Sequence, residues 1–219
     1  MTINKKSSDP KISVVIPCYN AGPYLRECLD SVFNQTLPPH EVIVVNDGST
    51  DNSLEILKSY LPRVRIISQT NKGVSVARNV GIRHCTGEWI AIQDADDIWA
   101  IEKLEKQWAA ICSCDEEVVC CYTDFFVFGP GIERTVCVRP EHHQMKDSMA
   151  EMLADWSVTS NSALFRFDKC QDVFFPENIK DGEDIIFFAM LRKKGPFIRH
   201  AEPLAGYRKH PKQRTADRK

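Results

Sequence analysis

The chain has 219 residues, of which 43% are hydrophobic and 26% are charged, the balance of a globular protein rather than of a disordered one. A chain of this length can bury the core of one large domain. Its formal net charge of -2 at pH 7 argues against a broad basic surface, so we expect no nucleic-acid partner.

The nine cysteines do not form a recognisable metal or disulfide pattern. Cys112 and Cys114, and the adjacent Cys120 and Cys121, lack the paired CxxC spacing of a zinc site. We therefore predict structural thiols in a reducing compartment. The start, "MTINKKSSDPKI", has no apolar stretch typical of a signal peptide, and no apolar run approaches the roughly 20 residues of a membrane span. We expect a cytoplasmic protein and leave open an association with the inner face of the membrane.

Strand and helix patterns alternate through the first half of the chain. Apolar runs rich in Val and Ile predict strands at residues 12–17, 41–47, 64–69 and 88–96, and helical periodicity predicts helices at 23–33, 52–61, 74–85 and 100–112. Asn52 and Glu55 have the spacing of a capping box at the second helix. This alternation predicts an α/β fold, a three-layer α/β/α sandwich with a mostly parallel central sheet.

The second half is less regular. Its patterns predict strands at 118–128, 134–139 and 161–167 and helices at 145–156 and 181–195. Without a repeat or a linker, we expect a flexible N-terminus (1–10), a single domain (11–210) and a basic C-terminal tail (211–219). The domain divides into a nucleotide-binding half (11–114) and an irregular half (115–210).

Polar segments follow each of the first strands, and in such sheets ligands bind beyond the carboxyl ends of the strands. After the first strand, Pro17, Tyr19 and Asn20 offer a ring and an amide that could stack on and hydrogen-bond a base. The alternative is a simple turn, for which Asn-Ala-Gly-Pro is well suited.

The second and third strands end in residues suited to a nucleotide. Asp47 at the tip of the second strand could accept hydrogen bonds from a ribose or a base, although Asp-Gly is also ordinary turn chemistry. Gly73 and Arg78 lie at a helix N-terminal region that could meet a phosphate. Alternatively, Arg78 pairs with a nearby carboxylate. Neither a GxGxxG motif nor a P-loop is present.

Three carboxylates crowd the end of the fourth strand, in "DADD". Asp94 and Asp96, separated by Ala95, are expected to point the same way, with Asp97 turned toward the following helix. A divalent cation between such carboxylates and a diphosphate would reverse their repulsion, and oxygen ligands suit Mg²⁺ or Mn²⁺. The alternative is that Asp96 and Asp97 only cap the next helix.

Two later segments add candidate groups. Glu183 and Asp184 begin a predicted helix, where a carboxylate could act as general base or simply cap the helix. His210 could contact a metal or a phosphate, or lie on the surface near the chain end.

Taken together, these segments resemble the family 2 glycosyltransferases, which have the A-type glycosyltransferase fold. The similar segments are "VVIPCYNAGPYLRECLDSVFNQT", "EVIVVNDGSTDNS", "NKGVSVARNVGIRHCTGEWIAIQDADDIW", "KLEKQ", "GEDIIFF" and "YRKH", from about residue 12 to 210. One departure is Ala100-Ile101, where the family often has a Pro before "KLE"; its loss should cost little at a helix start.

The resemblance implies transfer of a sugar, with inversion, from a nucleotide-diphosphate donor, with UDP-sugars the usual donors, to an acceptor hydroxyl in polysaccharide, lipopolysaccharide or other glycan synthesis. The nucleotide-binding residues would be Pro17, Tyr19, Asn20, Asp47, Gly73, Arg78, Asp94 and Ala95. Asp96, with His210, would bind Mn²⁺ or Mg²⁺, and Asp184 would be the base. In the acceptor-side half (115–210), Ser160, Asn161 and Glu183 are candidates to face a glycan, lipid-linked or protein acceptor. The oligomeric state is not predicted.

Two other functions compete with this interpretation. One is a nucleotide-sugar-binding module without turnover, which the presence of both a metal ligand and a base disfavours. The other is a sugar-1-phosphate nucleotidyltransferase, which usually needs a Gly-rich basic loop directly after the first strand, and "PCYNAGPYL" is not such a loop.

Overall fold

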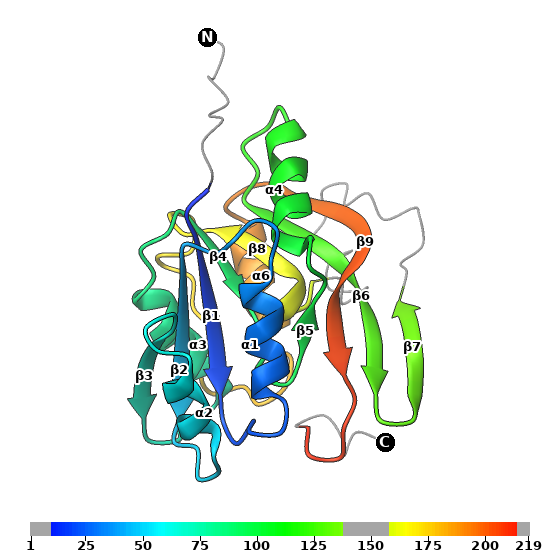
Figure 1. Cartoon of the computed structure of the whole chain (residues 1–219). Helices are drawn as coiled ribbons and strands as arrows, with labels where there is room; N and C mark the ends of the chain where they lie inside the picture. Colours follow the sequence, from blue (N-terminus) through cyan, green and yellow to red (C-terminus); the bar gives the residue numbers. More distant parts are fainter. Residues whose placement is uncertain (1–9, 138–157, 214–219) are drawn as a thin grey trace.

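A computed structural model of the chain describes residues 10–137 and 158–213 (Figure 1). The predicted helix at 145–156, the N-terminal residues 1–9 and the end of the basic tail at 214–219 lie outside the described residues.

The first half forms the parallel part of the sheet. Its elements are β1 (Ile12–Cys18), α1 (Leu25–Phe33), β2 (Glu41–Asp47), α2 (Ser53–Ser59), β3 (Arg65–Gln69), α3 (Val74–Arg83) and β4 (Trp89–Ile92). The strands are ordered β3-β2-β1-β4, and every pairing is parallel. Val14 of β1, for example, is in register with Val42 on one side and Ala91 on the other. Continuous apolar strands suit this position, because both faces of a parallel sheet are covered.

The remaining elements add antiparallel strands. The first half ends with β5 (Ile98–Trp99) and α4 (Lys103–Ser113), and the second half contains β6 (Cys120–Gly129), β7 (Ile132–Cys137), the 3₁₀ helix η1 (Ser160–Ser162), β8 (Ala163–Arg166), α6 (Glu183–Arg192) and β9 (Phe197–Arg208). The order β4-β8-β6-β9-β5 continues the sheet, with β7 also paired to β6. Of these pairings only β6 with β9 is parallel. The sheet is therefore mixed, with its parallel part concentrated in the first half.

The sheet curls back on itself (Figure 1). Only residues 93–97 separate β4 from β5 in the chain, yet β8, β6 and β9 stand between them in the sheet. The indole N–H of Trp99 in β5 donates to the backbone oxygen of Asn161 at 2.8 Å, in η1 directly before β8. Residues 93–97, which contain the three aspartates, thus connect β4 and β5, two strands that are far apart in the order of one curved sheet.

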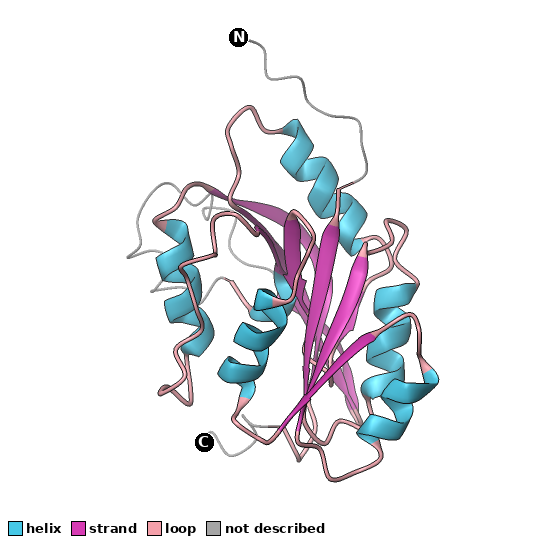
Figure 2. Ribbon diagram, turned by 90° about the vertical axis from the view of Figure 1, so that its left-hand side faces the viewer, coloured by secondary structure: helices cyan, strands magenta, loops and turns pink. Residues whose placement is uncertain are grey.

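Helices cover both faces of the sheet (Figure 2). One apolar core joins the sheet to α1, α2 and α4, and a second joins the other face to α3 and α6. The predicted three-layer sandwich is confirmed. The helix α3 lies very close to β1, because a Cβ added at Gly81 would stand 2.3 Å from a methyl of Val15.

Two strands were not predicted. The short β5 is only two residues long, and β9 mixes buried with partly exposed positions and contains Pro203. Neither shows the continuous apolar run of the parallel strands, so periodicity does not identify them. The fourth strand is also shorter than predicted: it ends at Ile92, and Asp94 to Asp97 form a turn closed by a 3.0 Å hydrogen bond.

The nine cysteines are all free thiols, and most are buried. Burial raises the pKa of Cys18 to about 11 and that of Cys85 to about 12, so both stay protonated at neutral pH. Both properties agree with the predicted structural role. Within the described part of the chain, every helix is too short or too polar to traverse a lipid bilayer.

Candidate active site

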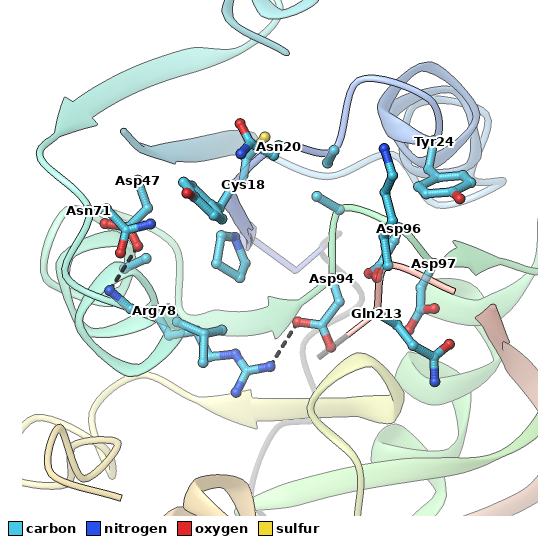
Figure 3. Close-up of a pocket in the computed structure, with 18 of the residues that line it drawn as sticks. Cys18, Asn20, Tyr24, Asp47, Asn71, Arg78, Asp94, Asp96, Asp97 and Gln213 are labelled. Carbon is cyan, nitrogen blue, oxygen red and sulfur yellow. Dashed lines mark hydrogen bonds and ion pairs between the residues drawn. The ribbon is translucent and has the colours of Figure 1, made fainter. Parts of the chain in front are cut away.

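A cavity of about 1250 Å³ opens at the carboxyl ends of β1, β2 and β4 (Figure 3). All eight residues predicted to bind a nucleotide line this cavity: Pro17, Tyr19, Asn20, Asp47, Gly73, Arg78, Asp94 and Ala95. The two predicted metal ligands, Asp96 and His210, line it as well. The fold therefore brings residues from distant segments into one site, as strand-end chemistry predicts.

Two loops of the site are joined by side-chain hydrogen bonds. Asn20, which has a positive φ of 49°, accepts a 2.8 Å hydrogen bond from the Thr50 amide through its side-chain oxygen. Asp51 accepts from the Gly22 amide at 2.9 Å and from the Ser53 amide at 2.9 Å. The loop after β1 is thereby fixed to the loop after β2. The capping box predicted at Asn52 is not formed, because the Asn52 side chain makes no cap hydrogen bond.

Asp47 holds the loop before α3. One carboxylate oxygen accepts from the Lys72 amide at 2.8 Å and from the Gln69 side chain at 2.7 Å, and the other accepts from the Gly73 amide at 2.8 Å. Gly48, at a φ of +72°, lets the loop after β2 approach the loop before α3 closely, because a Cβ there would lie 2.7 Å from the Asn71 nitrogen. A carboxylate has about four acceptor sites, so Asp47 can still accept a further donor from a ligand.

Tyr19 is the exposed aromatic ring of the site. Tyr19 lines the cavity, and 52% of its surface is accessible. A ring presented in this way can stack on a flat ligand such as a nucleobase.

Arg78 reaches across the site to Asp94 (Figure 3). Their ion pair is 2.8 Å long, and the arginine side chain is only 4% exposed. Burial lowers the pKa of Arg78, but the charge and hydrogen bond of Asp94, with the charges of Glu183 and Asp184, together outweigh this effect, and the pKa lies above its ordinary value. The alternative in which Arg78 pairs with a nearby carboxylate is therefore observed, and it is compatible with a ligand beside the pair.

The turn from Asp94 to Asp97 does not cap a helix. The next helix, α4, begins at Lys103, after β5. Asp97 instead accepts from the Arg208 amide at 2.8 Å and from the Asn161 side chain at 2.7 Å. Burial, with the charges of Asp96 and Asp94, raises the pKa of Asp97 well above its ordinary value. Asp97 thus anchors the turn to β9.

Asp96 and His210 face each other, with the histidine Nε2 3.0 Å from a carboxylate oxygen. The His210 ring also packs against Tyr24, with ring centroids 4.4 Å apart. Burial, followed by the charge of Asp94, raises the pKa of Asp96, whereas the hydrogen bond to His210 opposes this rise.

These two residues fit a divalent ion as a partial ligand set. Within the described residues, no group of three or more His, Cys, Asp or Glu side chains gathers as a metal centre. The buried Nδ1 of His210 makes no hydrogen bond within the same residues, and the other ring nitrogen meets Asp96. An oxygen and a nitrogen ligand this close could share one ion, while a ligand's phosphate oxygens would complete its shell.

Glu183 and Asp184 lie at the start of α6, behind Gly182, whose φ of 81° is left-handed. Glu183 is fully buried and pairs with Arg78 at 3.0 Å, so it does not lie on an open surface where an acceptor could bind, contrary to the expectation from the sequence. Asp184 accepts from the Ile185 amide at 3.0 Å. Burial raises the pKa of Asp184, while the charge of Arg78 lowers it. Neither carboxylate lines the cavity, and the helix N-cap, Gly182, has no side-chain cap.

The predicted acceptor wall lies elsewhere in the fold. Ser160 and Asn161 belong to η1, are buried, and do not line the cavity. The Asn161 side chain meets Asp97, so it supports the aspartate turn from behind.

Several cavity residues were not identified from the sequence. They include Tyr24, Asn71, Lys72, Glu177, Ile179, Lys180, Asp181, Tyr207, Lys212 and Gln213. Most lie in loops without a motif, and only the basic composition near the C-terminus hints at any of them.

Comparison with known proteins agrees with this site. A family model described as "Glycosyl transferase family 2" matches residues 13–174. Glycosyltransferase GlyG of Streptococcus pneumoniae is 36% identical over 165 residues, which cover 70% of this chain and 54% of that protein. The uncharacterized glycosyltransferase YibD of Escherichia coli is 52% identical over 94 residues, which cover 42% of this chain and 27% of that protein. The chain thus spans about half of GlyG and about a quarter of YibD.

Solved structures share the fold. The structure of S. aureus TarS 1-349 in complex with UDP-GlcNAc has a TM-score of 0.78 at 23% identity, covering 94% of this chain and 61% of that one. Mannosyltransferase PcManGT from Pyrobaculum calidifontis, in complex with GDP-Man and Mn²⁺, has a TM-score of 0.66 at 20% identity, covering 92% of this chain and 57% of that one. The expected A-type fold is confirmed, and with the family model covering most of the domain, the chain belongs to glycosyl transferase family 2.

Proposed function

We propose that this chain transfers a sugar, with inversion, from a nucleotide-diphosphate donor to an acceptor hydroxyl. The observation that carries the proposal is the single cavity in which every predicted nucleotide-binding residue meets Asp96 and His210. Its volume of about 1250 Å³ is ample for a nucleotide sugar. Membership of the family, and the sugar nucleotides bound by TarS and PcManGT, support the same class of donor.

In this proposal the loops after β1 and β2 hold the nucleoside. Tyr19 would stack on the base, and the remaining acceptor sites of Asp47 would take a base or ribose donor. The joined loops keep these groups in place before the donor arrives. We take a UDP-sugar as the donor to test first.

Asp96 and His210 would hold Mn²⁺ or Mg²⁺ together with the donor diphosphate. Such an ion supplies positive charge that stabilises the diphosphate as it departs. It also removes the repulsion that the aspartate turn would otherwise exert on the donor.

Asp184 would take the proton from the acceptor hydroxyl. The acceptor oxygen then forms its bond to the anomeric carbon, the bond from that carbon to the diphosphate oxygen breaks, and the electron pair leaves with the diphosphate. One displacement of this kind inverts the centre without a covalent enzyme intermediate. The raised pKa of Asp184 favours this use, because a carboxylate that binds protons more strongly is a better base.

The acceptor and the location in the cell are also proposals. A glycan, lipid-linked or protein hydroxyl fits the reaction, with polysaccharide or lipopolysaccharide synthesis as the setting to test. The nine free cysteines favour a reducing, cytoplasmic compartment, where the chain could work at the inner face of the membrane.

The test is an assay of UDP- and GDP-sugars with Mn²⁺ over a panel of acceptors, with nucleoside diphosphate release and product mass as readouts. We expect transfer by the native protein, and a loss of at least about 100-fold in kcat for Asp184→Asn with donor affinity retained. Tight donor binding without turnover would instead identify a binding module. Pyrophosphate release from a nucleoside triphosphate would identify a nucleotidyltransferase.

A further inference from the structure

Arg78 connects two carboxylates that belong to different parts of the site. One arm of its guanidinium pairs with Asp94 at 2.8 Å, and the other pairs with Glu183 at 3.0 Å. The Arg78 side chain is 4% exposed and that of Glu183 is fully buried. A planar guanidinium can bind two carboxylates in fixed directions, which a lysine ammonium cannot. The donor side of the cavity is therefore tied to the first turn of α6.

The surrounding residues hold Arg78 rigidly. Its guanidinium carbon lies 5.1 Å from the centroid of the Phe175 ring. Phe175 stacks on Phe187 of α6, with centroids 4.0 Å apart and planes at 5°. The neighbouring Asn79 side chain pairs with both the backbone N–H and the backbone oxygen of Phe175, each at 2.9 Å. The arginine, the loop at Phe175 and α6 thus form one packed unit.

Stability alone does not account for this buried charge cluster. Taking charged groups out of water costs several kcal/mol per ion, and apolar replacements of buried ion pairs are often equally stable. The Nε of Arg78 is buried and lacks a hydrogen bond within the described residues, so the cluster is not even fully satisfied. The cluster therefore contributes orientation rather than stability.

Glu183 immediately precedes Asp184 on the helix. Successive residues of an α-helix are about 100° apart around its axis, so holding the helix at one residue also fixes the backbone position and the Cα–Cβ direction of the next. Gly182, at a φ of 81°, sets where the helix begins. The contact between Arg78 and Glu183 therefore fixes the orientation of the helix turn that carries Asp184.

We propose that Arg78 and Glu183 are positioning residues. Their buried salt bridge holds Asp184 in a set place relative to Asp94, which lies in the proposed binding site for the sugar donor. This inference rests on the proposed role of Asp184 as the base. The charged groups that act on Asp184 are Arg78 from α3, Glu183 from its own helix and Asp94 after β4. Arg78 lowers the pKa of Asp184, whereas Glu183 and Asp94 raise it.

The test follows the titration of Asp184 directly by NMR of the aspartate carboxyl carbons in the full chain, with the signal assigned by its loss in Asp184→Asn. Glu183→Gln removes a neighbouring negative charge and frees Arg78 from one partner, so the titration midpoint should move to lower pH. Arg78→Gln/Glu183→Gln leaves no unpaired charge from the pair, so it protects the fold. Its midpoint should lie above that of Glu183→Gln, because the larger, lowering effect of Arg78 is also gone.

A control separates these effects from general loss of surface charge. Asp172→Asn removes the same charge from an exposed carboxylate that pairs with Lys194, and its Asp184 titration should match that of the native chain. In parallel, the pH dependence of kcat for transfer should be measured for each variant. Its acidic limb should move in the same direction as the titration midpoint of Asp184.

The outcomes distinguish the two proposals. If Asp184 titrates identically in the native chain, Glu183→Gln and the double variant, the positioning role is wrong, and the base assignment stands. If the titrations move as expected but Asp184→Asn retains full transfer, the proposed base is wrong and the structural coupling stands. Equal downward movement in Glu183→Gln and the double variant would also reject the inference, because it would signal general exposure of Asp184.

Discussion

The three aspartates of the turn each have a different partner. Asp94 pairs with Arg78, Asp96 faces His210, and Asp97 accepts from the backbone of Arg208. Each carboxylate thus has a partner within the chain, yet the repulsion expected from the sequence persists, because the charges of Asp96 and Asp94 raise the pKa of Asp97. An ion held jointly by Asp96 and His210 would replace their direct hydrogen bond.

We predict that Asp96→Ala weakens metal-dependent donor binding by about 10- to 100-fold, because a ligand of the ion is lost. Isothermal titration of a UDP-sugar, with Mn²⁺ and with EDTA, measures the effect. The exposed Asp168→Asn, which removes an equal charge, should bind the donor like the native chain. Donor affinity that is indifferent both to EDTA and to Asp96→Ala would contradict the metal assignment.

The raised pKa of Asp184 predicts the acidic limb of the activity. A base must be ionised to accept a proton, so activity is present above this pKa and falls about tenfold per pH unit as the pH falls below it. Because burial raises the pKa, the limb should lie above the value of about 3.9 for an exposed aspartate. A pH profile of kcat/KM measures it, and activity that stays constant down to about pH 4 would be inconsistent with Asp184 as the base.

At this scale the sequence predicts position better than contact. The residues predicted to bind a nucleotide line the cavity because strand ends in a parallel sheet meet at one edge. Their partners, such as the loop amides held by Asp47, depend on loop shape and leave no sequence pattern. The placement of Asn161 behind the aspartate turn depends on the pairing of β8, which the sequence does not reveal.

At the scale of elements, α4 carries a lysine in an unusual place. Lys103 is fully buried, donates to the Gln107 side chain at 2.8 Å, and lies 4.2 Å from the centroid of the Trp99 ring. Gln107 in turn donates to the backbone oxygens of Cys121 and Ser162, and so joins α4 to β6 and η1. Burial lowers the pKa of Lys103 to about 7.

This lysine predicts a pH-dependent stability. Between about pH 7 and 10 the unfolded chain holds a proton on Lys103 that the folded chain has lost, so the free energy of unfolding should rise with pH. Lys103→Met should be more stable than the native chain by about 1–4 kcal/mol at pH 6, with the difference narrowing toward pH 10.

Urea unfolding at pH 6 and pH 9.5 measures this difference. Lys106→Met, on the same helix but at a partly exposed position paired with Glu202, is the matched control and should not show the narrowing. Parallel stability curves for Lys103→Met and the native chain would mean that the lysine is solvated in solution.

Elements with strong local patterns were predictable, and those defined by distant pairing were not. The parallel strands were predicted from continuous apolar runs such as Val42 to Val45, which are buried on both faces of the sheet. The strand β9 has a mixed pattern because it is paired with β6 along most of its length but covered on its faces only in part. The fourth strand was extended to Asp96 because alternation continued through the aspartates, whereas the backbone turns after Ile92.

At the scale of the whole molecule, the two halves are interlocked. The strand β5 belongs to the first half in sequence but pairs only with β9 of the second within the described sheet. Ile98 is in register with Gly206, and a Cβ on that glycine would stand 2.6 Å from the Phe126 ring and 2.9 Å from Ile98. The aspartate turn therefore connects β4 to β5, and β5 is held in place by its pairing with β9.

We predict that Gly206→Val lowers both stability and donor affinity, although Gly206 does not line the cavity. Overpacking of this kind typically costs about 1–3 kcal/mol, and the displaced β5 should carry the aspartate turn with it. Urea unfolding and calorimetric donor binding provide the two readouts.

The exposed Val136→Thr on β7 should change the free energy of unfolding by no more than about 0.5 kcal/mol and leave binding intact. If folded Gly206→Val binds donor normally, the pairing of β5 does not set the geometry of the turn.

The return of β5 to β9 has a consequence for recombination between relatives. A crossover anywhere between residues 100 and 196 would give the hybrid an aspartate turn from one parent and the strand that supports it from the other. Transfer of a donor preference from one homologue to another should thus succeed more often when β9 (Phe197–Arg208) is exchanged together with the aspartate turn.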